Sequence, residues 1–249
     1  LEYSRFDWNI PYMKPRYNGG GNCVHWISDI KLSPFDSDTA LFNTGTGLFM
    51  ITGLASGDVL VKPFCEGIEE TVHLNVYTTP HGRNRIIDII GDLGGFAFED
   101  YDSECENSFA NENGDRYITC LNADFTLQRP EYIAATPRGN WTGKTKGGLI
   151  LSKDCGSTWE RLPMPRGLSE FIDKKLDNIE KPNVDSGWTA ISADGKRIMW
   201  AVAGGKGFSN KAVCYTDDEG KTWQKSIFTD SSGNSADEHN VKIFSDYYN

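Results

Sequence analysis

An eight-residue motif occurs twice in this chain and constrains its fold more than any other feature. Residues 152–159 (SKDCGSTW) and 216–223 (TDDEGKTW) both fit [ST]-x-D-x-G-x-T-W, and the two aspartates lie 64 residues apart. Aspartate readily bonds the backbone two residues on, and glycine supplies a positive φ, so D-x-G predicts a tight turn. Each copy follows a strand-like run, so we predict two exposed hairpin corners that hold the fold, with Trp159 and Trp223 largely buried beneath them.

The composition favours an all-β chain and excludes several kinds of partner. The 249 residues include 26 Gly, 7 Trp, 10 Tyr and 13 Phe, which suits a protein of many turns with aromatic fillers. One short helix is expected at 169–179, where apolar residues recur at helical spacing before Pro182. The net charge of −10 argues against binding to nucleic acid or to an anionic membrane surface. No apolar run approaches the length of a membrane span.

The cysteines bear on localisation and on metal binding. No CxxC pair or Cys/His cluster has the spacing of a zinc site, and Gly204–Gly207 lacks the context of a phosphate loop, so we expect no metal and no cofactor. An even count of six cysteines in an acidic chain favours a secreted, extracellular protein with some disulfides. Cys105 and Cys120 flank a polar loop and are the predicted pair, while six reduced, buried thiols are the alternative. The sequon at 140–142 (NWT) is compatible with secretion.

The repeated motif resembles the Asp-box, the turn found in blades of sialidase-type β-propellers. Such propellers are built from four-stranded blades around a channel, and sequence repeats are their expected signature. We expect residues 1–22 to form an irregular junction segment and residues 23–249 to form about four or five blades. The chain ends in strand-like sequence (VKIFSDYYN), so we predict an incomplete part of a seven-bladed propeller. Strand-like runs are expected at 26–32, 39–44, 66–79 and 86–90, near Tyr132, Ile191 and Ile198, and before both copies of the motif.

An ordered set of longer stretches makes the resemblance more specific. The stretches at 26–54, 66–80, 89–102 and 118–137, followed by the first copy of the motif, resemble the second half of glycoside hydrolase family 74. This family comprises the xyloglucanases and the oligoxyloglucan reducing-end-specific cellobiohydrolases, and the resemblance covers nearly the whole chain. It implies two seven-bladed propellers that face each other across a cleft. It also implies inverting hydrolysis of the β-1,4-glucan backbone of xyloglucan, a plant cell-wall polysaccharide, by one aspartate from each propeller.

The same resemblance places one of the two catalytic aspartates in this chain. The family motif G-D-[LIV]-x-G-F matches residues 91–96 (GDLGGF), so Asp92 takes the catalytic position. The first propeller's aspartate has no counterpart here, and we expect the rest of a two-propeller enzyme to supply it. Inverting hydrolysis needs one carboxylic acid to protonate the leaving oxygen and one carboxylate to activate water. Glycines at 91, 94 and 95 are expected to keep the surroundings open for a polymer.

Three further residues are candidates for binding the polysaccharide, namely Trp26, Phe96 and Glu70. Trp26 and Phe96 supply aromatic rings, and Glu70 follows Glu69 in a strand-like run, so that one of these two carboxylates can face the cleft. The chain departs from the family at Phe98, where relatives commonly carry His. Two alternatives therefore stay open: a non-catalytic propeller that binds glycan or protein, and another polysaccharide-degrading propeller such as a lyase.

Overall fold

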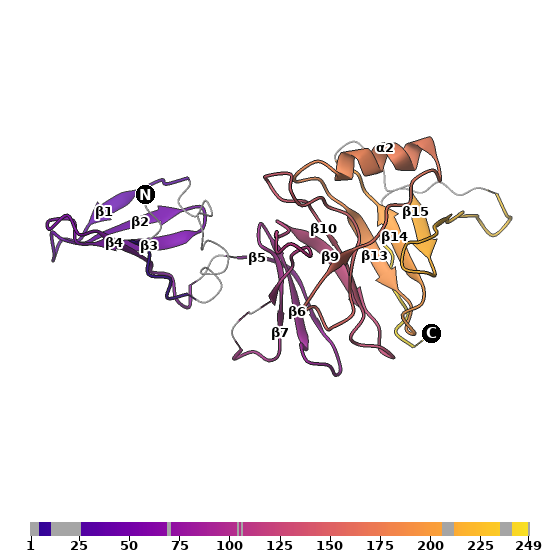
Figure 1. Ribbon diagram of the computed structural model, residues 1–249, viewed down its shortest axis with the longest axis horizontal. Helices are drawn as coiled ribbons and strands as arrows, with labels where there is room; N and C mark the ends of the chain where they lie inside the picture. The colour runs from indigo at the N-terminus through magenta and orange to yellow at the C-terminus, as the bar shows by residue number, and fades with distance from the viewer. Residues whose placement is uncertain are drawn as a thin grey trace. The chain divides into compact units, whose positions relative to one another are not determined.

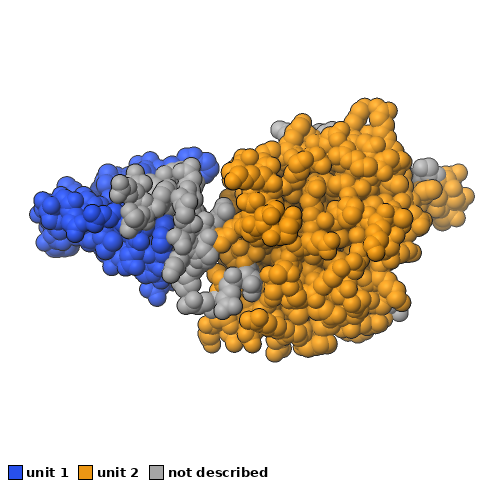
Figure 2. Space-filling view, viewed as in Figure 1, with its two compact units in different colours: residues 1–71 blue, residues 72–249 orange. Residues whose placement is uncertain are grey.

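The structure, a computed structural model, describes residues 5–10, 26–68, 71–103, 105, 107–205, 212–234 and 241–248. Within these ranges the chain forms four antiparallel sheets of four strands each (Figure 1). The strands of every sheet pair in chain order, so each sheet is a meander. This confirms the predicted all-β fold with four-stranded blades. The chain divides into two compact units, Leu1–Thr71 and Val72–Asn249 (Figure 2).

The first unit contains one sheet and its own apolar core. Phe42 and Phe49 come from neighbouring strands and stack with ring centroids 5.4 Å apart. Phe6 and Ile10 are buried in the same core, and Phe6 forms a parallel bridge with Val61. The described part of the predicted junction segment therefore packs with this unit. The strands are β1 (Ile30–Leu32), β2 (Ala40–Thr44), β3 (Gly47–Thr52) and β4 (Leu60–Pro63).

The second unit contains three sheets with apolar residues packed between them. Ile87, Phe109 and Trp159 belong to the core between its first two sheets. Leu151 and Trp200 belong to the core between its second and third sheets. The first sheet has β5 (Val72–Thr78), β6 (Ile86–Gly91), β7 (Gly94–Phe98) and β8 (Asn107–Ser108). The second has β9 (Cys120–Phe125), β10 (Ile133–Pro137), β11 (Ile150–Ser152) and β12 (Glu160–Arg161), and the third has β13 (Gly187–Ile191), β14 (Ile198–Val202), β15 (Val213–Thr216) and β16 (Gln224–Lys225).

The helix α2 (Glu170–Ile179) forms where the sequence predicts one and lies by the end of the third sheet (Figure 1). The Ser169 hydroxyl caps it by accepting the Ile172 N–H at 3.2 Å. Ile172, Leu176 and Ile179 are spaced along one face and are buried in the core between the second and third sheets. No helix among the described residues is long and apolar enough to cross a membrane.

Side chains on β9 tie the second sheet to the third. Asn122 Oδ1 accepts the Thr189 N–H at 2.7 Å, and Asp124 Oδ2 accepts the Ile191 N–H at 2.9 Å. Both acceptors lie on the first strand of one sheet, and both donors lie on the first strand of the next. These bonds give the edge of β13 polar partners, because a strand edge otherwise presents unpaired N–H groups. They hold the two sheets side by side as neighbouring blades.

The predicted Cys105–Cys120 disulfide is wrong, because the two residues are not bonded to each other. Cys120 is a fully buried thiol at the start of β9, and its Sγ donates to Asn122 O at 3.4 Å. Burial raises the pKa of the Cys120 thiol to about 12, so it stays protonated and unreactive. Cys120 thus behaves as a small core residue, whereas Cys105 lies in the loop after β7.

Candidate active site

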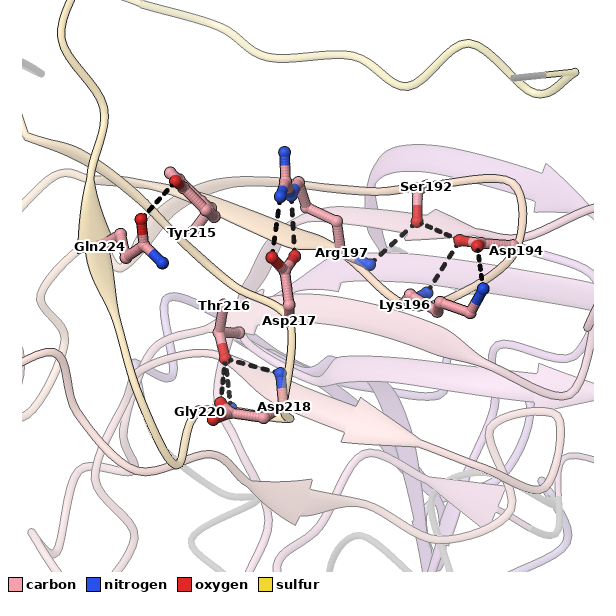
Figure 3. Close-up of polar contacts among 10 residues, drawn as sticks. All are labelled: Ser192, Asp194, Lys196, Arg197, Tyr215, Thr216, Asp217, Asp218, Gly220 and Gln224. Carbon is pink, nitrogen blue, oxygen red and sulfur yellow. Dashed lines mark hydrogen bonds and ion pairs between the residues drawn. The ribbon is translucent and has the colours of Figure 1, made fainter.

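Both copies of the repeated motif form the same hydrogen-bonded turn. Each links the third and fourth strands of a sheet, β11 to β12 and β15 to β16. In each turn the Ser or Thr hydroxyl accepts the Gly N–H at 2.8 Å, and the Asp carboxylate accepts the Thr N–H at 2.8 Å. Figure 3 shows part of the second turn, beside the two-bond ion pair of Arg197 with Asp217. The Ser or Thr hydroxyl and the Asp carboxylate of each motif therefore stabilise the turn.

The two motif tryptophans differ in burial. Trp159 is 4% exposed, its ring centroid lies 4.3 Å from that of Phe109, and its Nε1 donates to Gly156 O. Trp223 is only half-buried, less than predicted, and its Nε1 donates to Pro163 O at 2.9 Å. The reason is that Trp159 lies in the core between two sheets, whereas Trp223 packs at the margin of a core.

Asp92 lies in a turn at one end of its sheet. The turns of the repeated motif lie at the opposite end of their own sheets. Asp92 belongs to the connection between β6 and β7, the second and third strands of their sheet. In an antiparallel meander, successive turns alternate between the two ends of the sheet. A turn between strands two and three is therefore at the other end from a turn between strands three and four. The motif turns and Asp92 thus serve different ends of the blades.

The turn at Asp92 is tight and has an uncommon backbone geometry. Asp92 has a φ of 62°, and the Leu93 N–H donates to Gly91 O at 2.8 Å, which closes a three-residue turn around Asp92. A γ-turn with a positive φ at its centre is rare and strained. The Asp92 N–H donates to Thr119 Oγ1 at 2.9 Å. The residue itself is exposed, so its carboxylate is presented at the end of the sheet.

The glycines of the motif at 91–96 have a different role from the one expected. A Cβ on Gly94 would lie 2.7 Å from Tyr117 O, and a Cβ on Gly95 would lie 2.7 Å from Asp88 O. Gly94 also has a φ of 82°, and its N–H donates to Ile118 O at 3.0 Å. The expectation that these glycines keep the surroundings open is wrong. They allow the turn to pack closely on neighbouring backbone.

A polar row connects the Asp92 turn to the next two sheets. Thr119 O accepts the Arg138 N–H at 2.7 Å, directly after β10. The Arg138 guanidinium donates to Asn183 Oδ1 at 2.9 Å and forms an ion pair with Asp185, both just before β13. Three sheets therefore contribute polar groups to one continuous set of contacts. The loop between β10 and β11 begins at this row and carries Trp141, whose side chain is 59% exposed.

Known proteins resemble this chain in both sequence and structure. No family model matches it. A xyloglucanase from Paenibacillus sp is 26% identical over 206 residues, which are 80% of this chain and 18% of that protein. An oligoxyloglucan-reducing end-specific xyloglucanase from Emericella nidulans is 28% identical over 184 residues, 72% of this chain and 21% of that protein. In sequence, this chain is similar to proteins named xyloglucanases.

Two solved structures of family 74 enzymes share the fold of this chain. The xyloglucanase from Xanthomonas campestris aligns over 98% of this chain and 30% of its own, with a TM-score of 0.68 and 20% sequence identity. The family 74 enzyme of Niastella koreensis aligns over 99% of this chain and 29% of its own, with a TM-score of 0.67 and 19% identity. The chain spans about a fifth of the length of the curated relatives it matches.

The predicted binding residues differ in where the structure places them. Trp26 is 82% exposed but belongs to the first unit, whereas Asp92 belongs to the second. Phe96 is 4% exposed, so its ring has a packing role and offers no open face to a sugar. Glu70 lies outside the described residues. Phe98, where the resemblance led us to expect His, is partly buried with its ring 6.2 Å from that of Phe96.

A second carboxylate lies on the strand that leads to Asp92. Asp88 is buried on β6, and its two oxygens lie 3.0 and 2.8 Å from His73 Nδ1 on β5. Burial raises the pKa of Asp88, and the nearby His73 opposes that rise. The sequence carried a signal for Asp88 alone, since this residue interrupts the apolar run 86–90. Nothing in the sequence joined His73 to this aspartate.

The arrangement offers a carboxylate that is suited to acid–base chemistry. Asp92 is an exposed carboxylate on a turn that backbone and hydroxyl contacts fix in place. The described residues contain no group of three His, Cys, Asp or Glu side chains that could hold a metal ion. Thr119 and Arg138, which sequence reasoning missed, connect this turn to the rest of the blade ends. Their partners lie far away in the sequence, so no local pattern marks them.

Proposed function

We propose that this protein is a glycoside hydrolase that cleaves the β-1,4-glucan backbone of xyloglucan with inversion, and that Asp92 is one of its two catalytic carboxylates. The relationship to proteins named xyloglucanases, over 72% to 80% of this chain, is the observation that carries the proposal. The position of Asp92 supports it, because this aspartate is exposed at the end of a sheet, within a motif typical of the family. Because such a substrate is an extracellular polymer, we also propose that the protein is secreted.

The chemistry requires a second carboxylate in addition to Asp92. In inverting glycosidases, the acid and the base stand about 6.5 to 9.5 Å apart so that a water molecule fits between the base and the sugar. The resemblance assigns the partner carboxylate to the other propeller of the enzyme. Asp92 would then donate a proton to the leaving oxygen or accept one from the attacking water. The rigid turn would hold its carboxylate at a fixed distance from the sugar ring.

The test uses the full-length protein and its Asp92→Asn variant on xyloglucan. We expect the parent to release reducing ends and proton NMR to detect the inverted anomer first. Asn tolerates a positive φ, so the variant should keep the fold and the binding of oligosaccharide. Its turnover should fall by at least about 10²-fold, the lower end of what a positioned acid or base contributes. Unchanged turnover in the variant would remove Asp92 from the mechanism. The size distribution of early products would separate endo from exo cleavage.

A non-catalytic xyloglucan-binding propeller is the second candidate function. It is favoured by Phe98, which replaces the His that relatives commonly carry close to the catalytic motif. This candidate predicts that the full-length protein binds xyloglucan with equal affinity in parent and Asp92→Asn forms, without release of reducing ends. A lyase would instead form an unsaturated product that absorbs in the ultraviolet. The three outcomes exclude one another in one set of assays.

A further inference from the structure

Thr119 is the side chain that holds the backbone of Asp92. It lies directly before β9, it is 5% exposed, and its Oγ1 accepts the Asp92 N–H at 2.9 Å. The Thr119 backbone is itself fixed on two sides. It forms a parallel bridge with Gly94, and its carbonyl accepts the Arg138 N–H at 2.7 Å. The hydroxyl therefore acts from a rigid base that belongs to the second sheet, while Asp92 belongs to the first.

The turn at Asp92 needs such a support because its geometry is unfavourable for a residue with a side chain. A non-glycine residue with a φ of 62° carries backbone strain, which persists only when the surroundings over-determine the conformation. A glycine at this position would relieve that strain but would carry no carboxylate. The Leu93 N–H, the Gly94 N–H and the Asp92 N–H all have fixed acceptors. Of these three acceptors, only Thr119 Oγ1 is a side-chain atom.

We propose that Thr119 is the positioning residue for Asp92, an inference that rests on the proposed function of Asp92. The Thr119 hydroxyl sets the direction of the Asp92 N–H and thereby the direction in which the carboxylate leaves the turn. Without the hydroxyl, the turn relaxes toward a negative φ and the carboxylate swings away from its place at the sheet end. A displacement of about 1 Å at a catalytic group can reduce turnover by about 10²-fold.

The chain provides a matched control at the other end of the same strand. Thr126 lies directly after β9, just as Thr119 lies directly before this strand. Thr126 is fully buried, and its Oγ1 accepts the Arg129 N–H at 2.8 Å. Each threonine thus offers a buried hydroxyl to one backbone N–H in a turn. Removal of either hydroxyl by valine leaves one N–H without its acceptor. Only Thr119 acts on Asp92, so the pair separates positioning from general stability.

The experiment compares Thr119→Val, Thr119→Ser and Thr126→Val in the full-length protein. We expect Thr119→Val to lower kcat on xyloglucan by about 10- to 10²-fold with KM changed less than about twofold, because the loss falls on the chemical step. Thr119→Ser should restore most of kcat, since it keeps the hydroxyl. Thr126→Val should lower Tm about as much as Thr119→Val and leave kcat unchanged. Parent kcat in Thr119→Val, or an equal loss of kcat in Thr126→Val, would overturn the proposal.

A second measurement does not depend on turnover. Amide hydrogen exchange at Asp92 should accelerate by roughly tenfold in Thr119→Val, because the N–H loses its acceptor, and should stay at the parent rate in Thr126→Val. An unchanged exchange rate at Asp92 in Thr119→Val would overturn the proposal even if the protein has no hydrolase activity. The Asp92→Asn variant keeps the two proposals apart. Full activity in that variant refutes the proposed catalytic role of Asp92, whereas an inactive Asp92→Asn beside a fully active Thr119→Val refutes only the role of Thr119.

Discussion

Asp124 Oδ2 on β9 accepts the Ile191 N–H on β13 at 2.9 Å, so a buried carboxylate of one sheet bonds the backbone of the next. The same carboxyl group accepts the Phe125 N–H at 3.0 Å. Burial raises the pKa of Asp124, and the Ile191 N–H opposes the rise. The contact is therefore a structural bond between blades, made by a residue type that usually lies at the surface.

Asp124→Ala should destabilise the protein by about 1–3 kcal/mol, because the buried Ile191 N–H loses its acceptor. Urea unfolding followed by tryptophan fluorescence gives the free energy. Asp217→Ala is the matched control, since Asp217 is exposed and forms a surface ion pair with Arg197. That control should cost at most about 1 kcal/mol. Equal losses in the two variants would show that the contact between β9 and β13 contributes no more than a surface pair.

The hydrogen bond from the Thr N–H to the Asp carboxylate occurs in both motif turns, and the two turns differ in how deeply they are buried. Burial raises the pKa of Asp154, but the bonds from Thr158 and Ser152 outweigh it and leave the pKa lowered. Hydrogen bonds from Thr222 lower the pKa of Asp218. We expect Asp154→Ala to cost about 2 kcal/mol and Asp218→Ala to cost less, because only the first turn covers a tryptophan enclosed between two sheets.

Asp154 and Asp218 both have lowered pKa values, so the stability that each contributes depends on pH. Each carboxylate binds fewer protons in the folded state than in the unfolded state between its folded pKa and the ordinary value of 3.8. The stabilisation is therefore complete above pH 3.8 and is lost as the pH falls through the folded pKa. Unfolding curves measured at neutral pH and below 3.8 should show the parent approaching the alanine variants. A gap that does not change with pH would contradict the assignment of these bonds to the ionised carboxylates.

Lys175 of α2 is a fully buried cation and gives the protein a pH dependence on the alkaline side. Its Nζ donates to Val202 O at 2.6 Å, and burial lowers its pKa from 10.5 to about 8. Between these two pH values the unfolded chain binds more protons, so the stability contributed by this group rises with pH. The stability of the parent relative to Lys175→Met should increase by up to about 3 kcal/mol from pH 7.5 to 10.5.

This comparison cancels the other groups that titrate in the same range. The buried thiols and tyrosines are common to parent and variant, so their effects drop out of the difference in the free energy of unfolding. Thermal or urea unfolding at four or five pH values is sufficient. A difference between parent and Lys175→Met that stays constant across this range would mean that Lys175 titrates normally and that water reaches its ammonium group.

What the sequence could predict depends on how far apart the interacting residues lie. The helix at 170–179 and both motif turns were predictable, because their caps, spacing and glycines are local. Asp92 was found through a contiguous motif. The bond from Asp92 to Thr119 spans 27 residues, and the bond from Ile191 to Asp124 spans 67 residues. Such contacts are set by the stacking of sheets, and no periodicity along the chain reveals them.

The failed predictions have the same origin. Cys105 and Cys120 are close in sequence, but β9 carries Cys120 into the core between two sheets, away from the loop that holds Cys105. Phe96 belongs to the same motif as Asp92, yet its strand position turns the ring inward. The type of a residue and its neighbours in the sequence do not show which face of a blade is covered by another sheet. Burial by the adjacent sheet decides that, and it becomes visible only in three dimensions.

The strain at Asp92 predicts that the stability of variants at this position depends on how well the new residue adopts a positive φ. Asp92→Gly and Asp92→Ala both remove the carboxylate, but only glycine adopts a φ of 62° without a steric penalty. Alanine avoids the larger entropy loss of glycine on folding, which partly offsets its strain. We expect the glycine variant to be more stable than the alanine variant by about 0.5–1 kcal/mol, while neither variant hydrolyses xyloglucan at a measurable rate. Urea unfolding and reducing-end release measure the two properties in the full-length protein. If alanine proves as stable as glycine at this position, the turn is not strained, and the hydroxyl of Thr119 has no unfavourable conformation to hold.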